Sequence, residues 1–146
     1  MGGWLMTTVR EQILSRIATA LASAPSIGAP VYRSRHAPLA RGESPAVVVE
    51  PISDQANQVT VPKLDWTLTV RVSVIVRADI PDLAADTIIE AIHTKMMADL
   101  SFGGYAYDVQ PQSTSFEIMD TDVPAGVISY DFAVLYRTSL TDLAVV

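Results

Sequence analysis

The stretch LDWTLTVRVSVIVR (residues 64–77) decides the fold, because apolar and polar side chains alternate along its length. Every second residue from Leu64 to Val76 is apolar, and Ile75 is the only large apolar side chain at the positions between them. This period of two predicts a long strand with one buried and one solvated face. The stretch GVISYDFAVLYRTS (residues 126–139) alternates in a similar way. Both exceed the usual strand length of about 3–10 residues, and we interpret strands that outrun one compact domain as a sign of assembly.

The N-terminal region carries the pattern of an amphipathic helix. Thr8 and Glu11 stand three residues apart, which is the spacing of a capping box, in which both side chains bond free N–H groups at a helix start. Apolar residues then recur at helical intervals up to Leu21, and Pro25 follows. We therefore expect a packing helix that starts after Thr8 and stops before Pro25.

A second helix is predicted over residues 82–100. Pro81 suits the first helical turn, where the N–H group that proline lacks has no partner in any case, and Asp82 complements the helix dipole. Gly103 and Gly104 are expected to stop the helix. Its expected apolar stripe consists of Leu83, Ile88, Ile89, Ile92, Met96 and Leu100.

The remaining segments predict shorter strands and loops around the two long strands. Pro51 indicates an edge position or a bulge for the short strand at 46–52, and residues 105–119 form either a weaker strand pair or a strand that bends around Pro111. The order of elements predicts an α+β fold, with a mainly antiparallel sheet of four to six strands and two helices packed on one face. We expect a single domain over residues 1–146. Its less regular parts are a mobile N-terminal end at 1–6 and extended loops at 33–45 and 53–63.

Composition permits a sizeable core and excludes several kinds of chemistry. Hydrophobic residues make up 49% of the chain and charged residues only 18%, so the domain needs no disulfide or metal to fold, and its surface carries little charge for a monomer. The chain has no cysteine, which excludes disulfides, thiolate nucleophiles and cysteine–zinc sites. No apolar run approaches the ~18–20 residues that a membrane span needs.

Charge is distributed unevenly along the chain. Residues 1–45 carry five basic and two acidic groups, a net charge of +3, whereas residues 46–146 carry five basic and fourteen acidic groups, a net charge of −9. An acidic body binds DNA poorly, because affinity for phosphate depends on basic side chains. A basic segment on an acidic body can instead contact an acidic neighbour, including another copy of the same chain.

No pattern of catalytic, cofactor-binding or metal-ligating residues stands out. Of the two histidines, His36 lies in an arginine-rich segment, and His93 forms with Glu90 a single Glu-x-x-His unit, half of what a di-iron site requires. Asp120 and Asp122 lie in a turn that lacks the other ligands of a calcium loop. We therefore predict no enzymatic activity, no cofactor and no metal. The weakest alternative, a ligand-binding or enzymatic domain, requires a polar pocket between the second helix and the sheet.

Several stretches together resemble a protein family. They are VYRSRHAPLARGESPAVVV (31–49), VRAD (76–79), DTIIEAIHTKMMAD (86–99), AGVI (125–128) and YRT (136–138). In these stretches the chain resembles the tail terminator or tail completion proteins of long-tailed bacteriophages, which are also called minor tail protein U-like. The resemblance covers most of the chain, roughly from Val31 to Leu143.

This resemblance implies helices packed on a mainly antiparallel sheet, and a homo-hexameric ring at the head-proximal end of the virion tail. Such a ring ends polymerisation of the tail tube and offers a joining surface to the head. The implied partners are further copies of the chain, the tail tube protein and the head–tail connector or neck protein, with assembly in the host cytoplasm. DNA would pass the ring lumen without sequence-specific binding. The nearest alternative is another phage neck, head-completion or tail tube protein.

The basic arm within residues 33–45 is the main candidate for contacts between subunits. Its basic groups are expected to form salt bridges to an acidic neighbour, and the 53–63 loop is a further candidate contact with neighbouring rings. A solvated loop is the alternative interpretation of the arm. The candidate subunit or ring–ring interface residues are Arg33, Arg35, His36, Arg41, Asp54, Gln58, Lys63 and Arg137.

Overall fold

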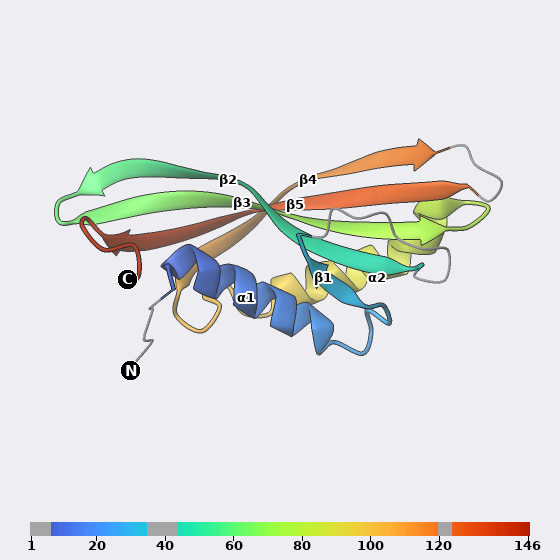
Figure 1. Cartoon of the computed structure of the whole chain (residues 1–146), viewed down its shortest axis with the longest axis horizontal. Coiled ribbons are helices and arrows are strands. Elements are labelled where there is room, and N and C mark those ends of the chain that lie inside the picture. The colour runs from blue at the N-terminus through green and yellow to red at the C-terminus, as the bar shows by residue number, and fades with distance from the viewer. Residues whose placement is uncertain (1–6, 35–43, 120–123) are drawn as a thin grey trace.

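Two helices lie on one side of a long, twisted, five-stranded sheet in the computed structural model (Figure 1). The structure describes residues 7–34, 44–119 and 124–146. The expected mobile end at 1–6 lies outside these residues, as does most of the expected loop at 33–45. The predicted α+β class, with two helices and a mostly antiparallel sheet, is confirmed.

The sheet has the strand order β1-β2-β3-β5-β4. The first strand is short and pairs in parallel with the second, whereas every other neighbouring pair is antiparallel. The two strands predicted from period-two alternation are β3 and β5, which pair along their whole length in the centre of the sheet. The strand bounds are Val31–Arg33 for β1, Ala46–Thr60 for β2, Lys63–Arg77 for β3, Ala106–Met119 for β4 and Ala125–Ser139 for β5.

The first helix, α1 (Val9–Ala22), forms as its capping pattern predicts. The Thr8 hydroxyl accepts a hydrogen bond from the Glu11 backbone N–H at 3.2 Å, which satisfies one of the free donors at the helix start. The helix then buries one stripe of side chains against the sheet, Val9, Ile13, Leu14, Ile17 and Leu21.

The second helix, α2 (Pro81–Met96), ends earlier than predicted. A turn follows it, in which the Asp99 carboxylate accepts hydrogen bonds from the backbone N–H groups of Ser101 and Gly103. This turn, and not the Gly103-Gly104 pair at the end of a longer helix, carries the chain from the helix to β4. Two residues of the predicted stripe are wrong, since Leu100 lies beyond the helix end and Leu83, inside the helix, is exposed like Leu100.

The prediction of a polar loop at 53–63 is also wrong. Strand β2 continues to Thr60, and its pairing with β3 extends from Ala46 opposite Ile75 to Thr60 opposite Lys63, so only Val61 and Pro62 form the turn. The polar residues belong to an exposed edge strand, where a solvated strand and a loop have the same composition. Of the two alternatives expected at 105–119, the single strand is correct: β4 is one strand whose register shifts between Pro111 and Ser113.

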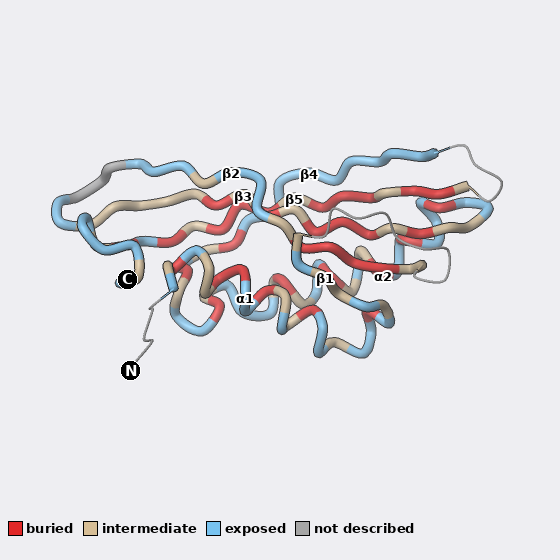
Figure 2. Tube along the Cα trace, viewed as in Figure 1, coloured by how far each residue is buried: buried red, intermediate tan, exposed pale blue. Residues whose placement is uncertain are grey.

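The core lies between the helices and the inner face of the sheet. The alternate apolar side chains of β3 and β5 face both helices, and Phe132, at the centre, is fully buried and stacks on Tyr130 with ring centroids 4.2 Å apart. Gly126 lets α2 approach closely, because a Cβ at this position would meet the Pro81 Cβ at 2.5 Å. Figure 2 shows the buried segments concentrated in the middle of the sheet, with exposed strand segments toward its ends.

Candidate assembly surfaces

The sheet is about twice as long as either helix, so the helices cannot cover it. At about 3.3 Å per residue, the 15 residues of β3 span roughly 50 Å, whereas the 16 residues of α2 span about 24 Å at 1.5 Å per residue. The far half of β2 extends past the helix layer along the long axis, whereas the far half of β4 runs along the edge of the sheet at the level of α2 (Figure 1). These two segments are mostly exposed in Figure 2.

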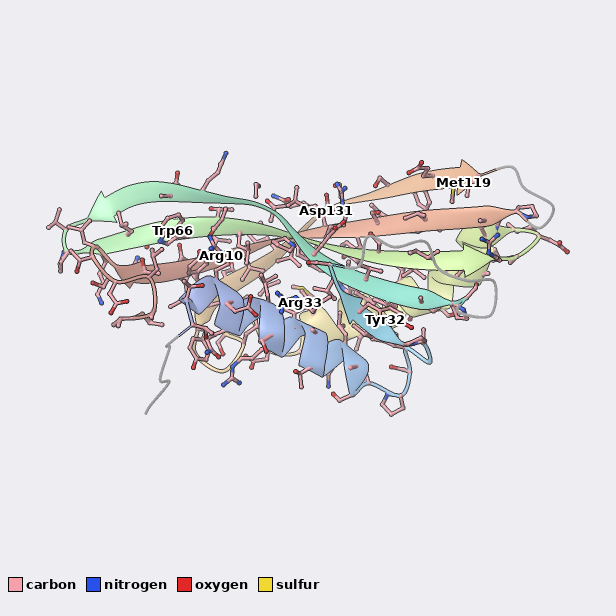
Figure 3. All side chains as sticks on the ribbon, in the orientation of Figure 1. Arg10, Tyr32, Arg33, Trp66, Met119 and Asp131 are labelled. Carbon is pink, nitrogen blue, oxygen red and sulfur yellow. The ribbon has the colours of Figure 1, made fainter. Side chains whose placement is uncertain are left out.

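Strand β4 forms one free edge of the sheet. It pairs with β5 alone among the described strands, and every residue from Gln110 to Met119 is exposed. Its end carries large apolar side chains in water, with Phe116 64% and Ile118 51% exposed. Met119 is also exposed, at the far end of the strand (Figure 3). Exposed apolar side chains gathered on an edge strand are typical of a surface that a partner covers.

The start of α2 extends this apolar surface. Phe116 and Ile118 stand opposite Ile128 and Gly126 of β5, which places them on the helix-bearing face. The Ile118 side chain and Pro81 both border the space above Gly126, which links β4 to the helix start. We call the exposed set Ile80, Leu83, Phe116 and Ile118 the β4 patch.

The far half of β2 forms the other free edge. Strand β1 covers only the segment from Val47 to Val49, so from Pro51 to Thr60 no described strand pairs with the outer side of β2. Ile52, with Ser53 and the residues from Gln55 to Asn57, is exposed. The two free edges therefore lie on different strands and belong to the same sheet.

The tip of the β2–β3 hairpin holds a second group of exposed apolar residues. The C-terminal segment folds back on this tip, where the Leu140 N–H donates to the Pro62 carbonyl at 2.7 Å and the Ser139 N–H donates to the Val145 carbonyl at 2.8 Å. The exposed apolar residues there are Val61, Leu140, Leu143, Val145 and Val146. This tip and the end of β4 lie at opposite ends of the long axis (Figure 1).

Several predicted interface residues make pairs within the chain. Arg33 donates two hydrogen bonds to the Glu11 carboxylate, at 3.0 and 3.1 Å, and this contact lowers the pKa of Glu11. Arg137 donates two to Asp65, at 2.5 and 3.3 Å. The Lys63 ammonium donates to the backbone carbonyl of Val146 at 3.0 Å. These three side chains therefore already have hydrogen-bond partners within the subunit.

The other predicted interface residues have different surroundings or lie outside the described chain. Gln58 lies in β2 opposite Leu64 of β3. Arg35, His36 and Arg41 fall outside the described residues. Their role in subunit contacts stays a prediction.

Asp54 lies in a partly buried polar cluster on the inner face. A register shift between Pro51 and Ser53 turns Asp54 toward α1, where its carboxylate accepts hydrogen bonds from the Tyr136 hydroxyl and, at 3.3 Å, from the Arg10 guanidinium (Figure 3). Burial raises the pKa of Asp54, against the opposing effect of these two bonds, and burial with the nearby carboxylate raises the pKa of Tyr136. The Asp54 Oδ1 atom is buried without a hydrogen-bond partner among the described residues. The cluster fixes the exposed half of β2 to α1.

The face without helices is polar, and its arginines Arg71 and Arg137 are ion-paired. Arg71 of β3 donates to Asp131 of β5 at 2.9 and 3.1 Å, and the hydroxyls of Ser73 and Ser129 lie 3.1 Å apart. Asp131 lies near the middle of this face (Figure 3). The hydrogen bond to Asp131 is the main cause that raises the pKa of Arg71. This face therefore presents hydroxyl groups and neutralised ion pairs, not a basic track for phosphates.

The space between α2 and the sheet is filled by side chains. Val72 and Phe132 of the sheet and Ile88, Ile92 and Met96 of the helix are all buried in one apolar cluster. This packing disfavours the ligand-pocket alternative, because that alternative needs a cavity with convergent polar groups at this place. His93 is exposed on α2, and its Nδ1 atom lies 2.6 Å from the Tyr130 hydroxyl oxygen.

A groove of about 410 Å³ lies between α1 and the turn after α2. Two of its charged lining residues are already engaged, since Arg16 stacks over the Tyr105 ring at 4.9 Å and Asp99 closes its own turn. In the described part of the chain no group of three or more histidine, aspartate or glutamate side chains is placed to hold a metal ion. None of the described helices is long and apolar enough to cross a membrane.

Comparison with known proteins gives a structural likeness only. No family model matches the chain, and no curated protein sequence matches it. Among solved structures, the chain is similar to a chain of the "Virion of native gene transfer agent (GTA) particle", with a TM-score of 0.49 and 15% sequence identity over 90% of this chain and 94% of that chain.

Proposed function

We propose that the protein is a structural virion component that forms a homo-oligomeric ring, caps the tail tube of a long-tailed phage, ends tube polymerisation and provides the head–tail joining surface. The observation that carries this proposal is the exposed half of β4, an edge strand with apolar side chains in water and no strand covering it among the described residues. The sequence resemblance to tail terminators supports the same function. No step of it requires a catalytic residue or a cofactor.

A ring requires two different surfaces on each subunit, and the two free sheet edges are the candidates that support this proposal. In a head-to-tail contact, one patch of a subunit meets a different patch of the next, and the assembly closes when the rotation between copies divides a full circle. The β4 edge and the β2 edge are two such surfaces on unlike strands. A two-fold dimer would instead need one self-complementary patch.

The paired charges of the helix-free face suit a surface that DNA passes without being held. Salt-bridged arginines such as Arg71 have little capacity left for phosphates, and the chain as a whole is acidic. We propose this face for the ring lumen. The tail tube and the head-side connector are then the partners of the two ring surfaces, at the head-proximal end of the tail.

Native mass separates this proposal from its nearest alternative. Light scattering over a concentration series, with negative-stain imaging of the same sample, is expected to show one closed ring near six subunits. Open stacks of rings would favour a tail tube protein. A monomer at every concentration that also fails to cap purified tail tubes would overturn the proposal.

The basic arm offers a second test of the proposed contacts. Reversing the charge of Arg33, Arg35 and Arg41 together should weaken ring assembly or docking, because these groups are proposed to face acidic groups of a neighbour. The matched control reverses the charge of Arg71, which is paired inside the subunit on the other face of the sheet. Normal tail length and normal head joining with the triple reversal would remove the arm from the interface.

A further inference from the structure

The tip of the β2–β3 hairpin carries an apolar surface that the described residues leave open. Residues 140–146 fold back on the hairpin turn and are fixed there by backbone hydrogen bonds, so their side chains form a defined surface. Each of the large apolar residues at this tip is between 41% and 66% exposed. We call the set Val61, Leu140, Leu143, Val145 and Val146 the tip patch. Apolar side chains gathered in this way are typical of a docking surface.

The start of α1 lies beside the tip patch. The Val9 N–H donates a hydrogen bond to the Leu143 carbonyl at 2.8 Å, and Thr8 and Leu143 line the same small cavity of about 10 Å³. Figure 1 shows the start of α1 and the residues after β5 at the same end of the molecule. The chain that precedes Thr7 therefore begins next to the patch.

The six residues before Thr7 are suited to an apolar surface. Their sequence, MGGWLM, contains four large apolar side chains and no charge. At about 3.3–3.6 Å per extended residue, Trp4 reaches roughly 11 Å from Thr7, and the same length covers the three residues from Leu143 to Val146. A segment tethered this close to a surface has an effective concentration on the order of millimolar, which favours it over a free competitor.

The charged groups at the tip favour an uncharged occupant. The Lys63 ammonium donates to the Val146 backbone carbonyl at 3.0 Å, and the Asp142 carboxylate accepts a hydrogen bond from the Ala144 N–H at 2.9 Å. Because these two charged groups are already bonded, the surface that they border is suited to an apolar segment. Tryptophan fits such a place well, since an aromatic ring of this class buries about 150–250 Å² in a contact.

We propose that residues 1–6 dock on the tip patch of their own chain, with the Trp4 ring as the main side chain that covers it. The contact belongs to the single subunit and does not depend on the proposed ring. It gives residues 1–6 a fixed position, in contrast to the mobile end expected from the sequence. A partner that binds this end of the molecule must then displace the segment first.

Fluorescence of Trp4 tests this contact. The chain has two tryptophans, so Trp66→Phe leaves Trp4 as the only one. Acrylamide should quench Trp4 several-fold less than it quenches a free tryptophan amide, because a docked ring is shielded from the quencher. Adding Val145→Asp places a charge in the patch and should raise the quenching to the free value. The matched control is Leu83→Asp, an exposed leucine of the β4 patch away from the tip, which should leave the quenching unchanged.

Cysteine cross-linking gives a second readout that keeps Trp66, whose indole N–H donates to the Thr138 hydroxyl at 2.9 Å. The natural chain has no cysteine. A chain with Leu5→Cys and Val145→Cys should form a link within one subunit on oxidation, seen as faster migration of the monomer on a non-reducing gel. Leu5→Cys combined with Leu83→Cys is the control and should not link.

Several results would overturn the docking. Quenching of Trp4 at the free value with an intact patch would show an undocked segment, and protection that persists with Val145→Asp would place the segment elsewhere. Links between separate chains that carry Leu5→Cys and Val145→Cys, with none inside the doubly substituted chain, would make a second copy the occupant. A link inside the subunit in a protein that forms no ring would overturn the proposed function and leave this contact in place.

Discussion

Strands β3 and β4 are nearly equal in length, with 15 and 14 residues, but they have opposite environments. The inner face of β3 from Leu68 to Val76 is buried under two helices, whereas β4 is exposed from Gln110 to its end. Packing the same kind of strand at the centre or at the edge of a sheet thus yields either a core or a surface. We therefore interpret the long strands in two ways: those in the middle of the sheet stabilise the core, and those at its edges form the proposed assembly surfaces.

Two phenylalanines allow the contrast between buried and exposed strands to be tested by mutation. Phe132 of β5 is fully buried, while Phe116 of β4 is 64% exposed, although their strands are neighbours in the sheet. The same substitution, phenylalanine to alanine, is expected to affect mainly the stability of the subunit at Phe132 and mainly its association at Phe116. The predictions below are ordered by their expected effect on the free energy of unfolding of the subunit.

The largest effect is expected from Phe132→Ala. Removing a fully buried ring leaves a cavity beside Tyr130, and such changes lower the free energy of unfolding by about 3–5 kcal/mol. Chemical denaturation followed by circular dichroism measures the loss. If the variant does not fold, Phe132→Leu should give a smaller loss on the same scale. A loss below ~1 kcal/mol for the alanine variant would contradict the position of the core.

A smaller loss, about 1–3 kcal/mol, is expected from Gly126→Ala, since the added methyl group overpacks a filled site. Its Cβ would lie 2.5 Å from the Pro81 Cβ and 3.2 Å from the Ile118 Cδ1 atom, so the helix start must move away from β5. Denaturation gives the loss, and native mass should also show weaker association because the β4 patch is disturbed. Ser115→Ala, on the exposed strand nearby, is the control and should change neither quantity. An unchanged stability for Gly126→Ala would mean that α2 does not pack this closely.

The Asp54 cluster predicts a pH dependence. Burial raises the pKa of this carboxyl in the folded protein above 3.8, so the folded state holds the proton more tightly than the unfolded chain. The resulting stabilisation is complete below that pH and is lost as the pH rises through the raised pKa. Asp54→Asn keeps an acceptor for Tyr136 and removes the titration, so the decline of stability above pH ~4 should become shallower than in the natural chain. Denaturation over a pH series measures this, and parallel curves for the two proteins would refute the cluster's role.

The smallest effect on the subunit is expected from Phe116→Ala, at most about 0.5 kcal/mol, because its ring is mostly in water already. Association should respond strongly, with a shift of native mass from ring toward monomer. Glu117→Ala, on the opposite face of β4 beside the same edge, is the matched control for the apolar patch. A loss of stability close to that of Phe132→Ala, with an unchanged ring, would identify Phe116 as a core residue.

Local patterns determined the central elements of this protein. Alternation over residues 64–77 and 126–139 predicts β3 and β5 because burial on one face of a strand selects every second residue, whatever the neighbouring strands are. The Thr8–Glu11 cap predicts the start of α1 for an equally local reason, since the capping bonds lie within one turn. With the helical spacing of α2, these signals suffice for the α+β class.

The extent and exposure of the edge strands β2 and β4, which form the proposed assembly surfaces, follow from the tertiary structure and not from local sequence. An exposed edge strand needs no apolar alternation, so residues 53–60 resemble a loop until their pairing with β3 is seen. The inward orientation of Asp54 depends on the register shift between Pro51 and Ser53, and the exact register is set by the pairing with β3. The apolar end of β4 is visible in the sequence as Phe116, Ile118 and Met119, but whether such residues are buried or exposed depends on how far α2 reaches. That reach is set by the packing of helix on sheet and not by the residues of β4 themselves.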